Sequence, residues 1–120
     1  MKRYFVYSIL AISLLSACQK QDETRTQCEQ GNFNSCYAYG LKFSRGTGVK
    51  RNINKALNYF EKACNGGYAD GCGYLATMYG LGDGVKMNQA TAKKYYGKAC
   101  ELGHKESCAT YQKMTQMGVK

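Results

Sequence analysis

The stretch Lys-Ala-Cys-Glu-Leu-Gly-His-Lys-Glu-Ser-Cys, residues 98–108, sets two cysteines eight positions apart around a glycine. Two earlier stretches repeat this arrangement, so the three cysteine pairs are Cys28 with Cys36, Cys64 with Cys72, and Cys100 with Cys108. Each pair begins 36 residues after the one before it. A period of that length is typical of a solenoid whose units are helix-turn-helix pairs.

The first helix of each unit is visible between the cysteine pairs. Asn52 and Asn88 are suited to cap helix N-termini, and both follow a glycine-rich loop. Apolar residues then recur at i, i+3, i+4 and i+7, which is one face of a helix. These residues are Ala56, Tyr59, Phe60 and Ala63 in one unit, and Ala92, Tyr95, Tyr96 and Ala99 in the next.

The second helix of each unit follows a short reversal. Gly67 and Gly103 can adopt positive φ and end the first helix, so the second begins near Ala69 or Lys105. Its inward face is expected to carry Cys72, Leu75, Ala76 and Tyr79, with the equivalents Cys36, Tyr39, Gly40, Phe43 and Cys108, Tyr111, Gln112, Thr115. Gln112 and Thr115 are polar, so the last helix is expected to cap the array. The sequence therefore predicts an all-α fold, a short α/α solenoid of about two and a half helix-turn-helix repeats.

The helical layout selects one cysteine pairing out of the fifteen that six cysteines allow. Each pair joins the last turn of one helix to the first turns of the next, across a short reversal. We therefore predict the disulfides Cys28–Cys36, Cys64–Cys72 and Cys100–Cys108. Each would close a C-x7-C ring, worth about 2.5 kcal/mol in lost chain entropy.

A metal site is the alternative use of the last cysteine pair. Cys100, His104 and Cys108 are possible zinc ligands at steps of four residues. Zinc sites usually close with four ligands and shorter cysteine steps, and the other two pairs enclose no histidine. We expect neither a metal nor a cofactor.

The N-terminus has the pattern of an export signal. A basic start precedes an uncharged, mostly apolar run over residues 4–16, which spans about 20 Å as a helix and is short for a bilayer of about 30 Å. Leu15-Ser16-Ala17-Cys18 resembles the lipobox of bacterial lipoproteins. The resemblance implies cleavage after residue 17 and lipid on Cys18. Residues 19–27 contain no apolar side chain, so residues 18–27 are expected to form a lipidated tether with a turn of helix at its end. An ordinary signal peptide with a chance cysteine is the alternative.

The lipobox implies a place in the bacterial envelope. Gln19 follows Cys18, where Asp would mark retention in the inner membrane, so the resemblance points to the outer membrane, facing the periplasm. Removing the signal takes Lys2 and Arg3 from a chain of 17 basic and 8 acidic residues. The mature chain is therefore strongly basic, which favours acidic proteins, anionic glycans or lipid head groups as neighbours. We expect no nucleic acid partner after export, and a generally solvated basic surface remains the alternative.

The spacing of cysteines, glycines and aromatic residues over residues 28–120 resembles the Sel-one-like repeat, a relative of the tetratricopeptide repeat. It is similar in particular to the subset known from the Helicobacter cysteine-rich proteins. The resemblance rests on residues 79–86 and 92–108 above all. It implies an α/α solenoid with one disulfide per repeat.

A repeat solenoid usually binds other proteins, so a binding surface is expected on the second helices. Positions that point away from the expected core vary between repeats, and we predict that a protein or peptide contacts Tyr74, Thr77, Met78, Leu41, Lys42, Lys113 and Met114. The alternative is that these residues are ordinary surface positions, with Tyr74 and Met78 partly packed.

The predicted function is a protein-binding scaffold or adaptor of the envelope, or an immunity protein against a secreted toxin. Some cysteine-rich relatives are described as penicillin-binding proteins or weak β-lactamases, so β-lactam hydrolysis is the alternative. The mature chain lacks both S-x-x-K and K-T-G. Its one histidine, His104, is either a base beside Glu101 or Glu106 or a solvated turn residue. We predict no catalytic residue.

Overall fold

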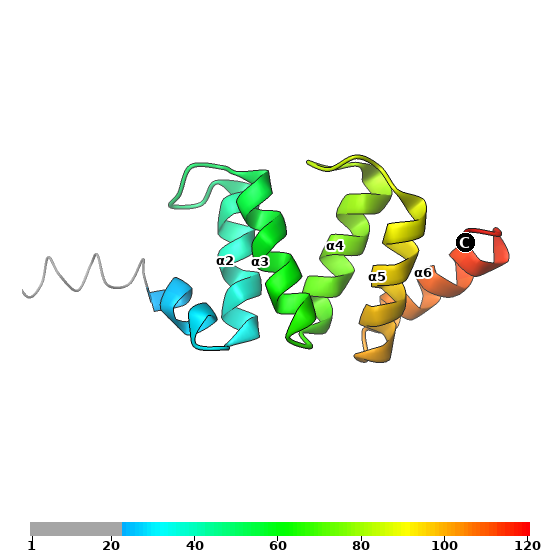
Figure 1. The fold of residues 1–120 in the computed structure, drawn as a ribbon, viewed down its shortest axis with the longest axis horizontal. Coiled ribbons are helices and arrows are strands. Elements are labelled where there is room, and N and C mark those ends of the chain that lie inside the picture. The colour runs from blue at the N-terminus through cyan, green and yellow to red at the C-terminus, as the bar shows by residue number, and fades with distance from the viewer. Residues whose placement is uncertain (1–22) are drawn as a thin grey trace, which may run out of the picture.

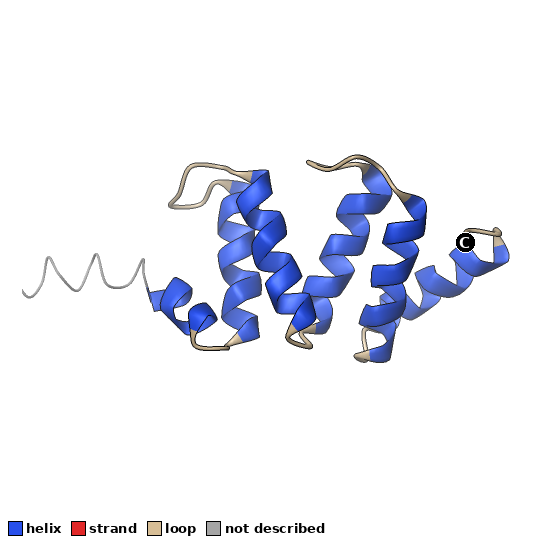
Figure 2. Cartoon of the chain, in the orientation of Figure 1, coloured by secondary structure: helices blue, strands red, loops and turns tan. Residues whose placement is uncertain are grey.

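The computed structural model describes residues 23–120, and every regular element in that range is a helix (Figure 2). A helical segment over residues 23–29 precedes α2 (Phe33–Arg45), α3 (Ile53–Asn65), α4 (Ala69–Leu81), α5 (Gln89–Glu101) and α6 (Lys105–Gln116). Figure 1 shows consecutive helices running up and down beside one another as an open array. The predicted all-α solenoid is confirmed. The predicted signal peptide over residues 1–17 and the lipidation site Cys18 lie outside the described residues.

No helix within residues 23–120 is both long enough and apolar enough to cross a membrane.

The helix boundaries lie where the capping residues predicted them. The side chains of Asn52 and Asn88 accept hydrogen bonds of 3.0 Å from the backbone N–H groups of Lys55 and Thr91. These bonds satisfy donors that the first turn of a helix leaves free. After α3 and α5, Gly67 and Gly103 adopt φ of 92° and 96°, which only glycine adopts readily, and α4 and α6 begin two residues later.

The core lies between the two helices of each pair and between neighbouring pairs. Ala56, Phe60 and Ala63 of α3 are fully buried, and so are Cys72, Leu75 and Ala76 of α4. At the far end, Gln112 and Thr115 of α6 are exposed, as expected of a capping helix. Tyr111, expected on the inward face, is 38% exposed and covers Gly97 of α5. Within the described residues the outer face of α6 is exposed.

Small residues let adjacent helices approach closely at a position that recurs every 36 residues. Ser35, Gly71 and Ser107 occupy it, and all three are buried. A Cβ atom added to Gly71 would lie 2.9 Å from the Cβ of Ala63 and 3.1 Å from the backbone nitrogen of Cys64. Backbone atoms cannot move aside easily, so this position excludes larger side chains.

The three disulfides are Cys28–Cys36, Cys64–Cys72 and Cys100–Cys108, each with Cα atoms 4.5 Å apart. The predicted pairing is confirmed. It joins the sulfurs of Cys100 and Cys108 to each other, so these two residues offer no free thiolates for the alternative metal site.

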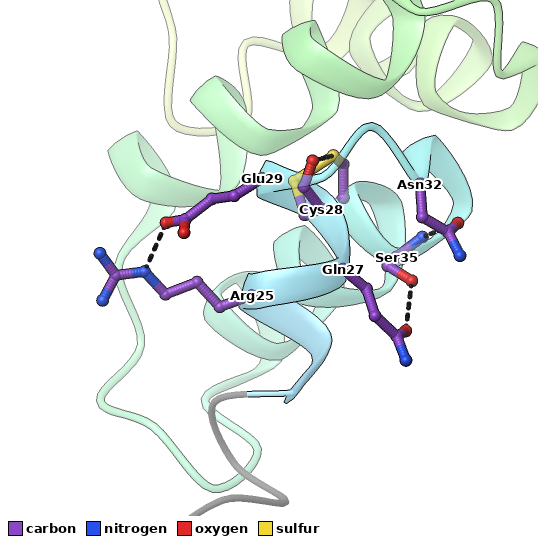
Figure 3. The surroundings of a disulfide bond; sticks show 7 residues. Arg25, Gln27, Cys28, Glu29, Asn32 and Ser35 are labelled. Atoms are coloured by element: carbon purple, nitrogen blue, oxygen red, sulfur yellow. Dashed lines mark hydrogen bonds and ion pairs between the residues drawn. A yellow bond between two sulfur atoms is a disulfide. The ribbon is translucent and has the colours of Figure 1, made fainter.

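The first disulfide ties the N-terminal helical segment to α2 (Figure 3). Arg25 and Glu29 form an ion pair of 2.9 Å along the segment, and the Ser35 hydroxyl donates a 2.9 Å hydrogen bond to the side chain of Gln27. Residues 23–27, the end of the predicted tether, are helical, where a turn of helix was expected.

Candidate functional site

The helices α2, α4 and α6, together with one residue of α5, line a cleft of about 390 Å³. It lies along the first halves of α4 and α6. The lining residues are Tyr37, Asp70, Gly73, Tyr74, Thr77, Tyr96, His104, Glu106, Ser107 and Thr110. A cleft of this volume is large enough for a few side chains of a bound peptide.

Aromatic side chains form one wall of the cleft. The rings of Tyr37 and Tyr74 lie 6.2 Å apart, edge to face, and both pack on the fully buried ring of Phe60, at 5.6 Å and 4.6 Å. Burial raises the pKa of Tyr37 above its ordinary value, with Asp70 as a further cause, so the phenol stays protonated at neutral pH. This wall offers aromatic faces and hydroxyl groups held by a rigid core.

Two carboxylates and one imidazole lie at the opening of the cleft. The Nε2 atom of His104 is 3.7 Å from Asp70 Oδ1 and 3.7 Å from Glu106 Oε2. Half of the Asp70 side chain and 84% of the Glu106 side chain are exposed, so both carboxylates can reach a ligand. The opening is thus acidic in a chain whose overall charge is strongly positive.

Ser107, His104 and the carboxylates resemble a serine hydrolase triad in composition, but the geometry is that of a helix cap. The Nδ1 atom of His104 accepts the backbone N–H of Ser107 at 3.2 Å and lies 2.7 Å from its hydroxyl. Asn32 accepts the backbone N–H of Ser35 at 3.2 Å in the same way, 72 residues earlier. Since Ser107 is only 1% exposed, its hydroxyl is not open to a substrate. These contacts begin α6 and do not activate a nucleophile.

The structure separates the residues that the sequence predicted as one binding surface. Tyr74 and Thr77 line the cleft, where the Thr77 hydroxyl lies 3.2 Å from that of Tyr96. Leu41 and Lys42 line a different hollow of about 200 Å³ on α2, together with Ala38, Arg45 and Thr47. Lys113 is exposed on α6 and lines neither.

The prediction that Met78 and Met114 lie on the surface is wrong. Met78 is 2% exposed and belongs to the main core, and Met114 is 8% exposed. The buried face of α4 is wider than a single stripe because α4 packs against α3 on one side and α5 on the other. The alternative interpretation, in which Met78 is packed, is the one that holds. His104 is not a freely solvated residue either, since 28% of its side chain is exposed and it caps α6.

The sequence patterns did not indicate that Tyr37, Asp70 and Tyr96 line the cleft. One signal was available, because Asp70 and Glu106 are both acidic and lie 36 residues apart. Equivalent positions of a solenoid face the same side, so a repeated acidic residue indicates a shared surface. Tyr37 gives no such signal, because Gly73 and Ala109 stand at its equivalent positions.

Comparison with known proteins agrees with the repeat period and the fold. The Sel1 repeat profile matches residues 34–68 and 69–104. Helicobacter pylori cysteine rich protein B is 35% identical, with a TM-score of 0.71 over 82% of this chain and 78% of that one. A Sel1 repeat protein from Oxalobacter formigenes has the same fold at 18% identity, with a TM-score of 0.79 over 84% of this chain and 76% of that one.

A third similar structure is c5321, a protective antigen of uropathogenic Escherichia coli with the same type of repeat. It is 29% identical, with a TM-score of 0.75, and the match covers 83% of this chain but 21% of that one. A comparison with curated protein sequences found no match. The matched residues, the fold and the disulfide-closed repeats lead to one conclusion: the chain belongs to the Sel1 repeat family, whose repeats form a protein-binding scaffold.

Proposed function

We propose that this chain is an envelope adaptor that holds an extended segment of a partner protein, with a basic side chain of that segment in the cleft. The observation that supports this most is the pair of carboxylates, Asp70 and Glu106, beside the tyrosine wall. A Lys or Arg side chain would form charge-assisted hydrogen bonds with the carboxylates and stack on a tyrosine face.

The overall charge of the chain favours an acidic ligand, but the acidic opening of the cleft favours a basic one. An acidic side chain at the opening of the cleft would meet the like charges of Asp70 and Glu106, which disfavours binding. The excess positive charge of the chain lies on other surfaces. We therefore assign the cleft to a basic segment.

Peptide selection tests this assignment. We expect random peptides selected on the oxidised chain to be enriched in Lys or Arg. Asp70→Asn combined with Glu106→Gln should then weaken the selected peptides about tenfold or more, because charge-assisted hydrogen bonds are lost. Fluorescence anisotropy with labelled peptides gives the dissociation constants.

The matched control is Asp83→Asn with Glu101→Gln, which removes two exposed carboxylates that do not line the cleft. This variant should bind the same peptides with unchanged affinity. Selection of peptides without basic residues, or equal weakening in the two variants, would contradict the proposal.

We further propose that the chain is a lipoprotein anchored through Cys18 and facing the periplasm from the outer membrane. The support is the lipobox at Leu15-Ser16-Ala17-Cys18. Mass spectrometry of the mature protein should show an N-terminal Cys18 carrying lipid, and a high-salt wash should extract the Cys18→Ala variant but not the parent chain from the membrane fraction. Two acyl chains give such stable anchoring, whereas one alone gives only marginal binding. A mature N-terminus with an unmodified Cys18 would rule the anchor out.

An immunity role is a narrower form of the binding proposal. It requires the segment held in the cleft to belong to a toxin, and a toxin gene beside this one would be the first support for it. No contact within residues 23–120 favours the β-lactam hydrolysis alternative. Ser107, the only serine that lines the cleft, is buried and serves the cap of α6.

A further inference from the structure

The two long loops of the solenoid lie on the same edge of the molecule. Residues 46–52 join α2 to α3, residues 82–88 join α4 to α5, and both appear along the upper edge in Figure 1. The short turns after α3 and α5 lie along the opposite edge. We name these the loop edge, residues 42–55 and 81–94, and the turn edge, residues 61–70 and 97–106.

Positive charge is concentrated at the loop edge. It carries eight basic residues and one acidic residue, which are Lys42, Arg45, Lys50, Arg51, Lys55, Lys86, Lys93, Lys94 and Asp83. The turn edge carries three basic and four acidic residues, which are Lys62, Lys98, Lys105, Glu61, Asp70, Glu101 and Glu106. The basic residues are scattered in the sequence, and the fold brings the two loops that carry many of them to one edge.

Two large apolar side chains lie on the same edge without a covering partner. Leu81 is 74% exposed and Met87 is 60% exposed. Their equivalents one repeat earlier are Arg45 and Arg51, both exposed. The second half of the loop edge therefore offers apolar groups at the positions where the first half offers guanidinium groups.

We infer that the loop edge rests on a membrane surface rich in anionic phospholipid. Lysine and arginine side chains near such a surface are attracted by the head groups, and apolar side chains beside them insert into the boundary with the acyl chains. Leu81 and Met87 line neither the cleft nor the hollow on α2. Apolar side chains on an outer edge of the molecule are suited to contact with a flat membrane surface. They are less suited to holding a side chain that projects from a partner protein. The cleft lies toward the turn edge and would remain free to bind its segment.

Vesicle binding of the full chain tests this inference, because any contribution of residues 1–22 is then common to all variants. The probes are vesicles of phosphatidylglycerol with phosphatidylcholine, and vesicles of phosphatidylcholine alone. Lys50→Glu with Lys86→Glu should weaken binding to the anionic vesicles about tenfold or more, since each basic residue near the surface contributes about fivefold. Leu81→Ser with Met87→Ser should also weaken it, by about tenfold.

The matched control is Lys62→Glu with Lys105→Glu, the same charge change on exposed lysines of the turn edge. This control should weaken binding by less than about twofold. Far-UV circular dichroism and a count of free thiols verify that each variant is folded. Equal weakening by both pairs of charge reversals would show that only net charge matters and would overturn the inference. So would binding that depends on the loop edge but is made only to a polyglutamate peptide, because the partner would then be an acidic protein.

Discussion

Phe60→Ala is expected to lower the free energy of unfolding by about 3–5 kcal/mol. Phe60 is fully buried, and its ring contacts the rings of Tyr37 and Tyr74 on the cleft wall. It also lies directly over Gly40, where an added Cβ would be 2.7 Å from its ring. The cavity left by its removal would border three helices, and a domain of this size has only about 5–15 kcal/mol to lose. Urea unfolding of the oxidised chain measures the loss.

Tyr96→Ala is the matched control for Phe60→Ala, because Tyr96 occupies the equivalent position one repeat later. Tyr96 is only partly buried. Its removal should cost about 1–2 kcal/mol, because truncation costs less where the side chain is already partly in water. An equal cost at the two positions would show that the core is not centred between α2, α3 and α4.

Cys64→Ala combined with Cys72→Ala is expected to cost at least about 2.5 kcal/mol, the second large effect. The disulfide removes chain entropy from the unfolded state, and both cysteines are also fully buried within the main core. Urea unfolding under oxidising conditions, monitored by circular dichroism, gives the difference from the parent chain.

The terminal disulfide provides the comparison. Cys100 and Cys108 close a ring of the same size but are only partly buried. Their replacement by alanine should lose the same entropy term and little packing, so it should cost less than replacement of the central pair. A larger cost for the terminal pair would contradict this account of the repeats.

The sequence was sufficient to predict the fold because every local signal repeats. Asn52 and Asn88 cap helices at the same register, and each cysteine pair joins the end of one helix to the start of the next. A single such signal is weak evidence for a helix boundary, but signals that repeat at a fixed spacing of 36 residues restrict the possible helix boundaries together. The disulfide pairing followed from that layout.

The binding surface was harder to predict because burial of a helix depends on its neighbours. Periodicity assigns one inward stripe to each helix, whereas α4 is packed on two sides and therefore also buries Met78. The cleft also brings together Tyr37 and Glu106, which are far apart in the sequence. Their proximity follows from the way in which α2, α4 and α6 line one cleft, which no local pattern encodes.

Site-specific photo-crosslinking in the native envelope tests most directly whether the cleft holds a basic segment of a partner protein. A photoreactive amino acid replaces either the exposed Thr77 in the cleft or the exposed Asn58 on α3, which does not line it. We expect one dominant protein to be crosslinked from Thr77 and none from Asn58, and we expect the crosslink to be lost when Asp70→Asn and Glu106→Gln are added. The same proteins crosslinked from both positions, or a crosslink from Thr77 that persists without the two carboxylates, would contradict the proposal.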